Sequence, residues 1–265
     1  MIAAAATYGY VGWVGLAASL LLVGIAIAIS GWQRLGLERS LLWASTRAIV
    51  QLLAVGAVLA FVLSPRVPLV VSWLWVAGMV VFAGDTVRRR APEVPGAFGL
   101  ALMSMALAGS VSLLILFGLG IFPLNARTLI PLSGMVVGNS LTGTVVAARR
   151  VVGELSDKRN EVEARLALGL SSRDAARPYV REALRTALIS QIESTKAVGL
   201  VFLPGAMTGL ILAGEKPIDA VLVQAAVMFL ILGAVATTAA AMSLGLARRL
   251  FTADHRLVRV ERRTA

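Results

Sequence analysis

The sequence contains no cysteine, one histidine (His255) and few charges for its length. The absence of cysteine excludes disulfides, thiolate metal sites and a cysteine nucleophile. Only 15% of the 265 residues are charged, whereas a soluble domain of this length carries about 25%. The sequence also lacks the G-x-x-x-x-G-K-[ST] phosphate loop and the H-E-x-x-H and G-x-S-x-G motifs of hydrolases. We therefore do not expect an enzyme, and this chain cannot hydrolyse ATP through a phosphate loop.

Long apolar runs are what the sequence has in excess. Hydrophobic residues make up 58% of the chain and stand in continuous stretches. Because a helix needs about 20 apolar residues to cross about 30 Å of hydrocarbon, such runs predict an all-α, polytopic helical membrane protein rather than a β-barrel. We expect a single transmembrane domain, 1–265, with about seven spans: 11–30, 44–63, 69–87, 97–121, 128–147, 197–214 and 218–246.

Lysine and arginine are unevenly distributed over the connections between these runs. All but three of the 25 basic residues fall on alternate connections or on the tail; the exceptions are Arg66, Arg127 and Lys216. Basic connections favour the cytoplasmic side of a membrane. We therefore expect the N-terminus outside, with a loop of about 150–196 and a basic tail of about 247–265 in the cytoplasm. The same bias explains the net charge of +11, so no nucleic-acid partner is expected.

Residues 155–196 form the one long polar segment. Gly169 is placed to end a helix over 162–168, and Ser171 with Asp174 can cap the next one. Because Pro178 suits the first turn of a helix better than its interior, we expect a very short helix at about 172–177, lying crosswise between two longer ones. Such a segment can meet a partner in the water, and the alternative is an ordinary amphipathic loop.

The order E-A-x-x-x-x-G occurs in this segment as Glu163, Ala164 and Gly169. It resembles the EAA loop of ABC-transporter permeases, which docks in a groove of the ATPase subunit. The Leu-Pro that often follows in importers is absent here, where Tyr179-Val180-Arg181 stands instead. The resemblance implies a set of ATPase-docking residues: Glu163, Ala164, Gly169, Ser172, Asp174, Arg177 and Pro178.

Three longer blocks, 47–52, 130–140 and 193–209, resemble the iron-export permease family of FetB-like proteins, which is similar to the plant aluminium-sensitivity permeases. The resemblance covers about residues 35–260. It implies a homodimeric, multi-pass membrane half of an ABC exporter in the cell inner membrane, with iron as the cargo. It also implies a separate ATPase subunit that holds ATP and Mg²⁺, while this chain binds no cofactor itself.

A few polar residues in or near the expected spans are candidates for a translocation path or gate. Glu193 and Lys196 are three apart and can pair, and Arg47 and Gln51 lie four apart at a similar depth. These four could form one polar cluster, or they could be solvated groups at helix ends. Asp85 is expected to pair with Arg88 and Arg89. The full candidate set is Arg47, Gln51, Asn139, Glu193, Lys196, Pro204 and Gln224.

The positions of proline and glycine lead to two further expectations. Pro204 falls inside the expected sixth span and must kink it, either as a hinge or as a static bend. Gly134 and Gly138 stand four apart, as do Gly205 and Gly209. Small residues at this spacing let helices approach closely in lipid, so we expect packing within the subunit or a dimer seam, with the lining of a path as the alternative.

The residues themselves do not identify the cargo. Ferrous ion favours histidine, carboxylate or cysteine ligands, whereas the spans offer Asp85, Glu193 and scattered methionines, which more often fill cores. The metal ligands are therefore unknown, and iron rests on the resemblance alone. An ABC exporter of a non-metal small molecule is the alternative, followed by a non-ABC integral membrane protein. A retinal protein is disfavoured because the seventh span has no lysine for a Schiff base.

Overall fold

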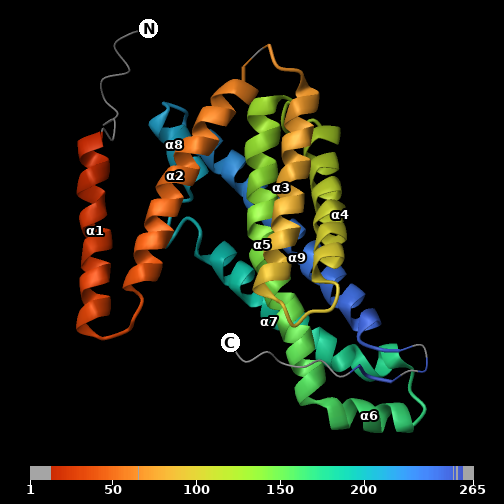
Figure 1. The fold of residues 1–265 in the computed structure, drawn as a ribbon. Coiled ribbons are helices and arrows are strands. Elements are labelled where there is room, and N and C mark those ends of the chain that lie inside the picture. The colour runs from red at the N-terminus through yellow and green to blue at the C-terminus, as the bar shows by residue number, and fades with distance from the viewer. Residues whose placement is uncertain (1–12, 65, 253, 255, 259–265) are drawn as a thin grey trace. The chain divides into compact units, whose positions relative to one another are not determined.

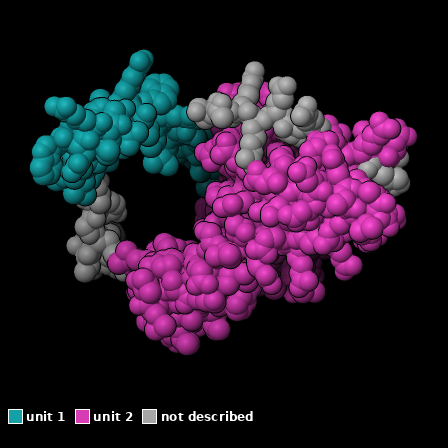
Figure 2. Space-filling view, turned by 90° about the horizontal axis from the view of Figure 1, so that it is seen from below, with its two compact units in different colours: residues 1–67 teal, residues 68–265 magenta. Residues whose placement is uncertain are grey.

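The computed structural model describes residues 13–64, 66–252, 254 and 256–258, and these form helices, turns and two isolated β-bridges. The contacts divide the chain into two units, residues 1–67 and 68–265 (Figure 2). The expectation of one domain over 1–265 stays a prediction. The helices in chain order (Figure 1) are α1 (Trp13–Trp32), α2 (Glu38–Val62), α3 (Leu69–Arg90), α4 (Ala97–Gly118), α5 (Ala126–Asp157), α6 (Arg159–Ala167), α7 (Ser172–Ala197), α8 (Gly205–Leu212) and α9 (Pro217–Arg249).

In the first unit, α1 and α2 pack together as a hairpin. Ser30, which is only 2% exposed, closes the turn between them. Its hydroxyl donates to Oε1 of Glu38 at 2.8 Å and accepts the backbone N–H of Leu37 at 3.1 Å. Most apolar side chains of these two helices are exposed within the unit, as befits helices whose surroundings are lipid or another protein.

In the second unit, α5 and α9 form the centre of the helix packing. Helix α5 contacts α3, α4, α7 and α9, and α9 also contacts α4, α7 and α8. Small residues allow the close approach: Ala147, Ala187 and Ala239 form one buried cluster of α5, α7 and α9. A methyl group added at Gly143 would lie 2.7 Å from Cγ1 of Val235. Close packing of this kind replaces the hydrophobic drive that is missing between helices in lipid.

The protein is a multi-pass membrane protein. Of the described helices, six are long and apolar enough to cross a bilayer: α1 from Val14 onward, α2, α3, α4, α5 and α9. The expected sixth span, 197–214, is wrong as one continuous helix. Helix α7 ends at Ala197, and residues 198–204 form a break in which Gly199 has a φ of +84° and its N–H donates to the carbonyl of Phe202.

This break also corrects the interpretation of Pro204. The residue does not kink a helix; it precedes α8 at the N-cap position with extended backbone angles. A proline there removes an N–H at the boundary of α8, where helical amides lack intrahelical partners in any case. Between α7 and α9 the chain therefore continues through the break and the eight residues of α8 rather than through one long span.

Within the second unit, the connections fall at two opposite ends (Figure 1). The α3–α4 turn, α6 and the described residues after α9 lie at one end, and the α4–α5 and α8–α9 turns lie at the other. Arg127 and Lys216, at the starts of α5 and α9, belong to the second end. Among the described residues of this unit, most basic side chains therefore lie toward the first end, whereas Lys196 stands in the last turn of α7 beside the break. The expectation that this end and the C-terminus face the cytoplasm stays a prediction.

The polar segment is partly as expected. Gly169 has a φ of +86° and follows α6, and the Ser171 hydroxyl accepts the backbone N–H of Asp174 at 3.2 Å at the start of α7. The expected short helix at 172–177 is wrong, because α7 continues through Pro178 to Ala197. Pro178 forfeits one hydrogen bond near the helix start, and the buried face of α7 outweighs that loss: Ala175, Ala176, Tyr179, Val180, Ala183 and Ala187. The short helix that lies crosswise is α6 (Figure 1).

The close approach of α5 and α9 leads to a test by overpacking. Gly143→Leu should lower the stability of the protein by about 1–3 kcal/mol, because the new side chain must displace Val235. Thermal unfolding in detergent measures the effect. Gly233→Leu is the matched control, since Gly233 is exposed on α9 and a methyl group there meets nothing within 4 Å. Equal losses in the two variants would contradict the packing account.

Candidate functional site

The polar end of the second unit is the candidate site. We define it as the α3–α4 turn, the last turns of α5, helix α6, the first half of α7 and residues 250–252, 254 and 256–258. Helix α5 has 32 residues, a length of about 48 Å, and so exceeds the hydrocarbon thickness of about 30 Å. Its surplus lies in the last turns, which carry Arg149, Arg150, Glu154 and Asp157. The length of α5 therefore sets α6 beyond the apolar part of the bundle.

Helix α6 is fixed to α7 through Glu161. One carboxylate oxygen of Glu161 lies 3.0 Å from Nζ of Lys158, and the other accepts the Tyr179 hydroxyl at 2.9 Å. The Arg165 guanidinium stands 5.8 Å from the centre of the Tyr179 ring. The hydrogen bond from Lys158, followed by that from Tyr179, lowers the pKa of Glu161 below its usual value. Burial, followed by the bond to Glu161, raises the pKa of Tyr179.

The outer face of α6 presents the EAA-like residues. Val162 points inward and is fully buried in the core, whereas Glu163 and Ala164 are exposed. Glu163 pairs with Arg159 at 2.6 Å. Beyond α6, Gly169 is exposed, and Leu168 beside it is 82% exposed. Of the other residues expected to dock an ATPase, Asp174, Arg177 and Pro178 are exposed and Ser172 is half-buried.

Longer-range contacts join the α3–α4 turn to this end. Glu93 pairs with Arg149 of α5 at 3.0 Å, and Arg249 of α9 donates to the carbonyl of Gly96 at 3.3 Å. Gly96 has a φ of +63°, and a methyl group there would collide with the Arg249 guanidinium. The sequence did not predict these partners, because no spacing rule connects residues 56 or 153 positions apart.

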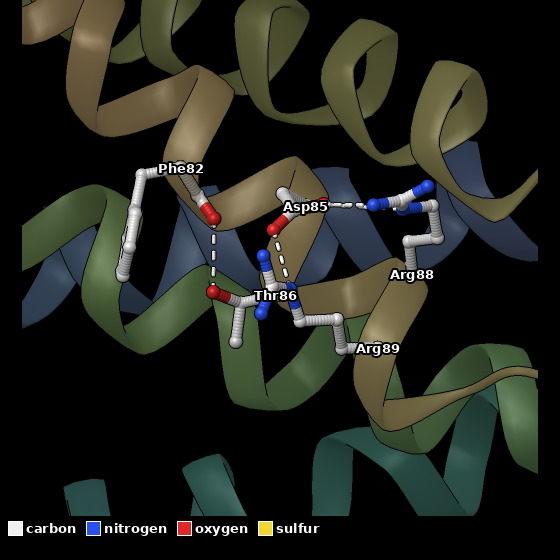
Figure 3. Close-up of polar contacts among 5 residues, drawn as sticks. All are labelled: Phe82, Asp85, Thr86, Arg88 and Arg89. Atoms are coloured by element: carbon white, nitrogen blue, oxygen red, sulfur yellow. Dashed lines mark hydrogen bonds and ion pairs between the residues drawn. The ribbon is translucent and has the colours of Figure 1, made fainter.

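The expected pairing of Asp85 is confirmed. Its two carboxylate oxygens accept from Arg88 and Arg89, each at 2.6 Å (Figure 3). All three residues lie in the last two turns of α3, where Thr86 also donates to the carbonyl of Phe82 at 2.9 Å. Both arginines are exposed. The group is therefore a paired charge at the helix end, in which both oxygens of the Asp85 carboxylate are bonded to arginine.

The candidate gate residues occupy separate environments. Glu193 and Lys196 pair at 2.9 Å as expected, and both are exposed. Asn139 is exposed and donates to the carbonyl of Met135 on its own helix at 2.8 Å. Arg47 and Gln51 are exposed on α2, in the other unit. The proposed single cluster of Arg47 and Gln51 with Glu193 and Lys196 therefore stays a prediction.

Gln224 has a specific partner that its position in the sequence did not predict. The residue is 4% exposed on α9, and its Oε1 accepts the backbone N–H of Met207 at 3.2 Å. Met207 is the third residue of α8, where backbone N–H groups have no partner within the helix. Gln224 thus caps α8 from α9 and fastens the helix that follows the break.

The four glycines expected at close helix contacts differ in how near their neighbours lie. A methyl group at Gly134 would lie 3.7 Å from Cε of Met79, which is ordinary contact. At Gly138, Gly205 and Gly209 it would meet nothing within 4 Å. Gly143 and Gly245 are tighter packing sites between helices, each 2.7 Å from a neighbouring side chain by the same measure. For Gly138, Gly205 and Gly209, the role in a seam with a second copy stays a prediction.

No three histidine, aspartate or glutamate side chains of the described residues gather closely enough to hold a metal ion. The metal ligands therefore remain unassigned.

Comparison with known proteins identifies the family. The uncharacterised protein family UPF0014 matches residues 13–251. The chain belongs to the UPF0014 family. It is 39% identical over 226 residues to the UPF0014 membrane protein STAR2 of Oryza sativa subsp. japonica, covering 84% of this chain and 78% of that protein. It is 36% identical over 225 residues to the protein ALUMINUM SENSITIVE 3 of Arabidopsis thaliana, covering 84% and 81%.

A bacterial UPF0014 relative confirms the family resemblance that the three sequence blocks indicated. The chain is 30% identical over 243 residues to the probable iron export permease protein FetB of Escherichia coli (strain K12), covering 92% of this chain and 93% of that protein. No solved structure matches. The UPF0014 match ends at residue 251, so residues 252–258 of the polar end lie beyond it.

The Glu161 contact predicts a pH dependence. A carboxylate whose pKa is lowered by folding contributes stability above its unfolded value, here 4.5, and loses it as the pH falls through the folded value. Glu161→Gln should therefore be less stable than the wild type at pH 7, with the difference shrinking as the pH falls below 4.5. The effect should be small because Glu161 is exposed. Thermal unfolding against pH measures it; a constant difference from pH 7 to pH 3 would contradict the assignment.

Proposed function

We propose that this UPF0014 protein is the membrane-spanning permease subunit of an ABC exporter, driven by a separate ATPase subunit that docks on segment 155–196. The observation that supports this proposal most directly is the arrangement of α6. Its inner residue Val162 is buried in the core, while Glu163, Ala164 and Gly169 are presented on the outside at the polar end. In this proposal the polar end faces the cytoplasm, in line with its excess of basic residues.

Helix α6 is suited to transmit force. It contacts both α5 and α7, and Glu161 fixes it to Tyr179 of α7. Helix α7 then runs for 26 residues, about 39 Å, from Ser172 to the break after Ala197. A displacement of α6 by a docked ATPase would therefore reach the break through one continuous helix. ATP and Mg²⁺ belong to the ATPase in this scheme, and the chain binds no cofactor of its own.

The translocation path is proposed to run along the crossing formed by α7, the break and α8. A broken helix frees backbone carbonyl and amide groups at depth, which transporters use to contact a cargo. Pro204 and the cap from Gln224 fix the start of α8, so movement would be confined to residues 198–203. We further propose a homodimer, with the open faces at Gly138, Gly205 and Gly209 as the seam.

The proposed cargo is a metal ion, with iron first, because the FetB relative is named a probable iron export permease. Glu193 and Lys196 pair with each other near the break, so they are proposed as a gate rather than as strong ligands. A weak, transient site suits an exporter, which must release what it carries. Export of a non-metal small molecule is the competing outcome of the cargo test below.

Docking is tested by placing a bulky, charged side chain on α6 or in the α6–α7 turn. Gly169→Arg and Ala164→Arg should each abolish co-purification of the ATPase subunit, because both positions are exposed on the proposed contact face. Gly214→Arg is the matched control: Gly214 has a similar φ of +95° and open space, but it lies in the α8–α9 turn at the opposite end. Retention of the ATPase by the Gly169 and Ala164 variants would refute docking on α6.

Cargo is tested in cells with and without this chain and its ATPase. Cells that express both should contain less iron and tolerate added iron better than cells that lack either one. The Gly169→Arg variant should behave as the deletion does if coupling to the ATPase drives export. Unchanged contents of iron and of other transition metals, together with intact ATPase docking, would favour a non-metal cargo.

A further inference from the structure

Residues 250–252, 254 and 256–258, which follow α9, fold back onto the polar end as a short hairpin. Phe251 and Leu257 form an antiparallel bridge. The backbone N–H of Thr252 donates to the carbonyl of Arg256 at 2.9 Å, and that of Val258 donates to the carbonyl of Leu250 at 2.8 Å. Leu250 and Leu257 are 1% and 6% exposed and belong to the same core cluster as Val162 of α6. This tail hairpin, defined as residues 250–252, 254 and 256–258, is therefore a packed part of the polar end.

Arg159 connects the tail hairpin directly to α6. Its Nη2 donates to the carbonyl of Leu257 at 2.9 Å, while its Nε pairs with Glu163 at 2.6 Å. Arg159 and Leu257 are 98 positions apart in the chain. One guanidinium thus positions an EAA-like residue against the tail hairpin.

Together, α6, the α6–α7 turn and the tail hairpin line a pocket of about 580 Å³. Its apolar lining comes from Leu166, Leu170 and Leu257, and Gly169 adds backbone. Its charged lining comes from Arg159, Glu163, Asp254 and Arg256. Arg159 and Glu163 are paired with each other, whereas Asp254 and Arg256 are exposed and have no ion-pair partner among the described residues.

We propose that the tail hairpin forms the second wall of the ATPase-docking surface, and that this pocket receives an apolar side chain of the ATPase subunit. The inference rests on the proposed function. An apolar centre with a charged rim is the usual anatomy of a protein–protein interface. Leu168, 82% exposed beside Gly169, extends the apolar contact. A second copy of this chain fits less well, because the pocket lies at the polar end, away from the apolar helix faces that would meet within the bilayer.

The rim charges provide the test. The ATPase subunit is titrated against the full chain in lipid nanodiscs at two salt concentrations. Arg256→Glu should weaken binding at least about threefold, mainly by slowing association, and should change the salt dependence, as expected for a rim charge that faces the partner. Arg256→Lys keeps the positive charge and should bind as the wild type does. Arg248→Glu is the matched control, since Arg248 is also exposed but does not line the pocket. Thermal unfolding of each variant verifies the fold.

The outcomes separate this inference from the proposed function. Weaker binding by Arg256→Glu alone, with rescue by Arg256→Lys, supports the second wall. Equal weakening by Arg248→Glu would reflect general charge and would overturn it. If Gly169→Arg abolishes binding while Arg256→Glu binds as the wild type does, the tail inference fails and docking on α6 stands. If the wild-type chain does not bind the ATPase, the proposed function fails and the inference fails with it.

Discussion

The length of α5 is the constraint on which the other features depend. A helix of 32 residues cannot be contained in about 30 Å of hydrocarbon, so its last turns must leave the apolar layer. Those turns hold the α3–α4 connection through Arg149 and Glu93, and they lead directly into α6. Helix α9, with 33 residues, extends in the same way and delivers the tail hairpin to the same end. Two helices that are longer than the hydrocarbon layer thus carry the polar end beyond the apolar part of the bundle.

Helix α7 joins the polar end to the break. Helix α7 begins at the α6–α7 turn and ends at the break, and its buried alanine-rich face holds it against α5 and α9. Gln224 fastens α8 on the far side of the break. In the proposed mechanism, residues 198–203 are therefore the segment where a displacement of α7 would change the structure. In the proposed exporter, this is how an ATPase bound at α6 acts on a path in the membrane.

Local chemistry made part of this structure predictable. Long apolar runs predicted the membrane helices, Gly169 and Ser171 marked the boundary between α6 and α7, and Asp85 was expected to pair with its neighbouring arginines. The prediction that a short helix ends before Pro178 was wrong, because the burial of one face of α7 outweighed the loss of one helical hydrogen bond. The run 197–214 is apolar enough for a span, but apolarity does not reveal that Gly199 adopts a positive φ and that Pro204 starts a new helix.

Contacts between distant residues could not be inferred from the sequence. Gln224 capping Met207, Glu93 pairing with Arg149 and Arg159 holding Leu257 each join separate elements, and no local pattern specifies them. Gly143 and Gly245 escaped notice for the same reason: their importance comes from Val235 and Leu100 on neighbouring helices. The helix boundary at Gly169 and Ser171 was thus predictable, whereas the packing of the tail hairpin against α6 was not.

Site-specific cross-linking tests the central claim most directly. The chain has no cysteine, so a single cysteine can be placed at Leu168, the exposed residue beside Gly169, and another, separately, at Leu124 in the α4–α5 turn. In membranes that contain the ATPase subunit, the cysteine at 168 should form a cross-link to the ATPase and the cysteine at 124 should not. Cross-linking from position 124, or none from position 168 while the ATPase remains bound, would contradict docking at α6.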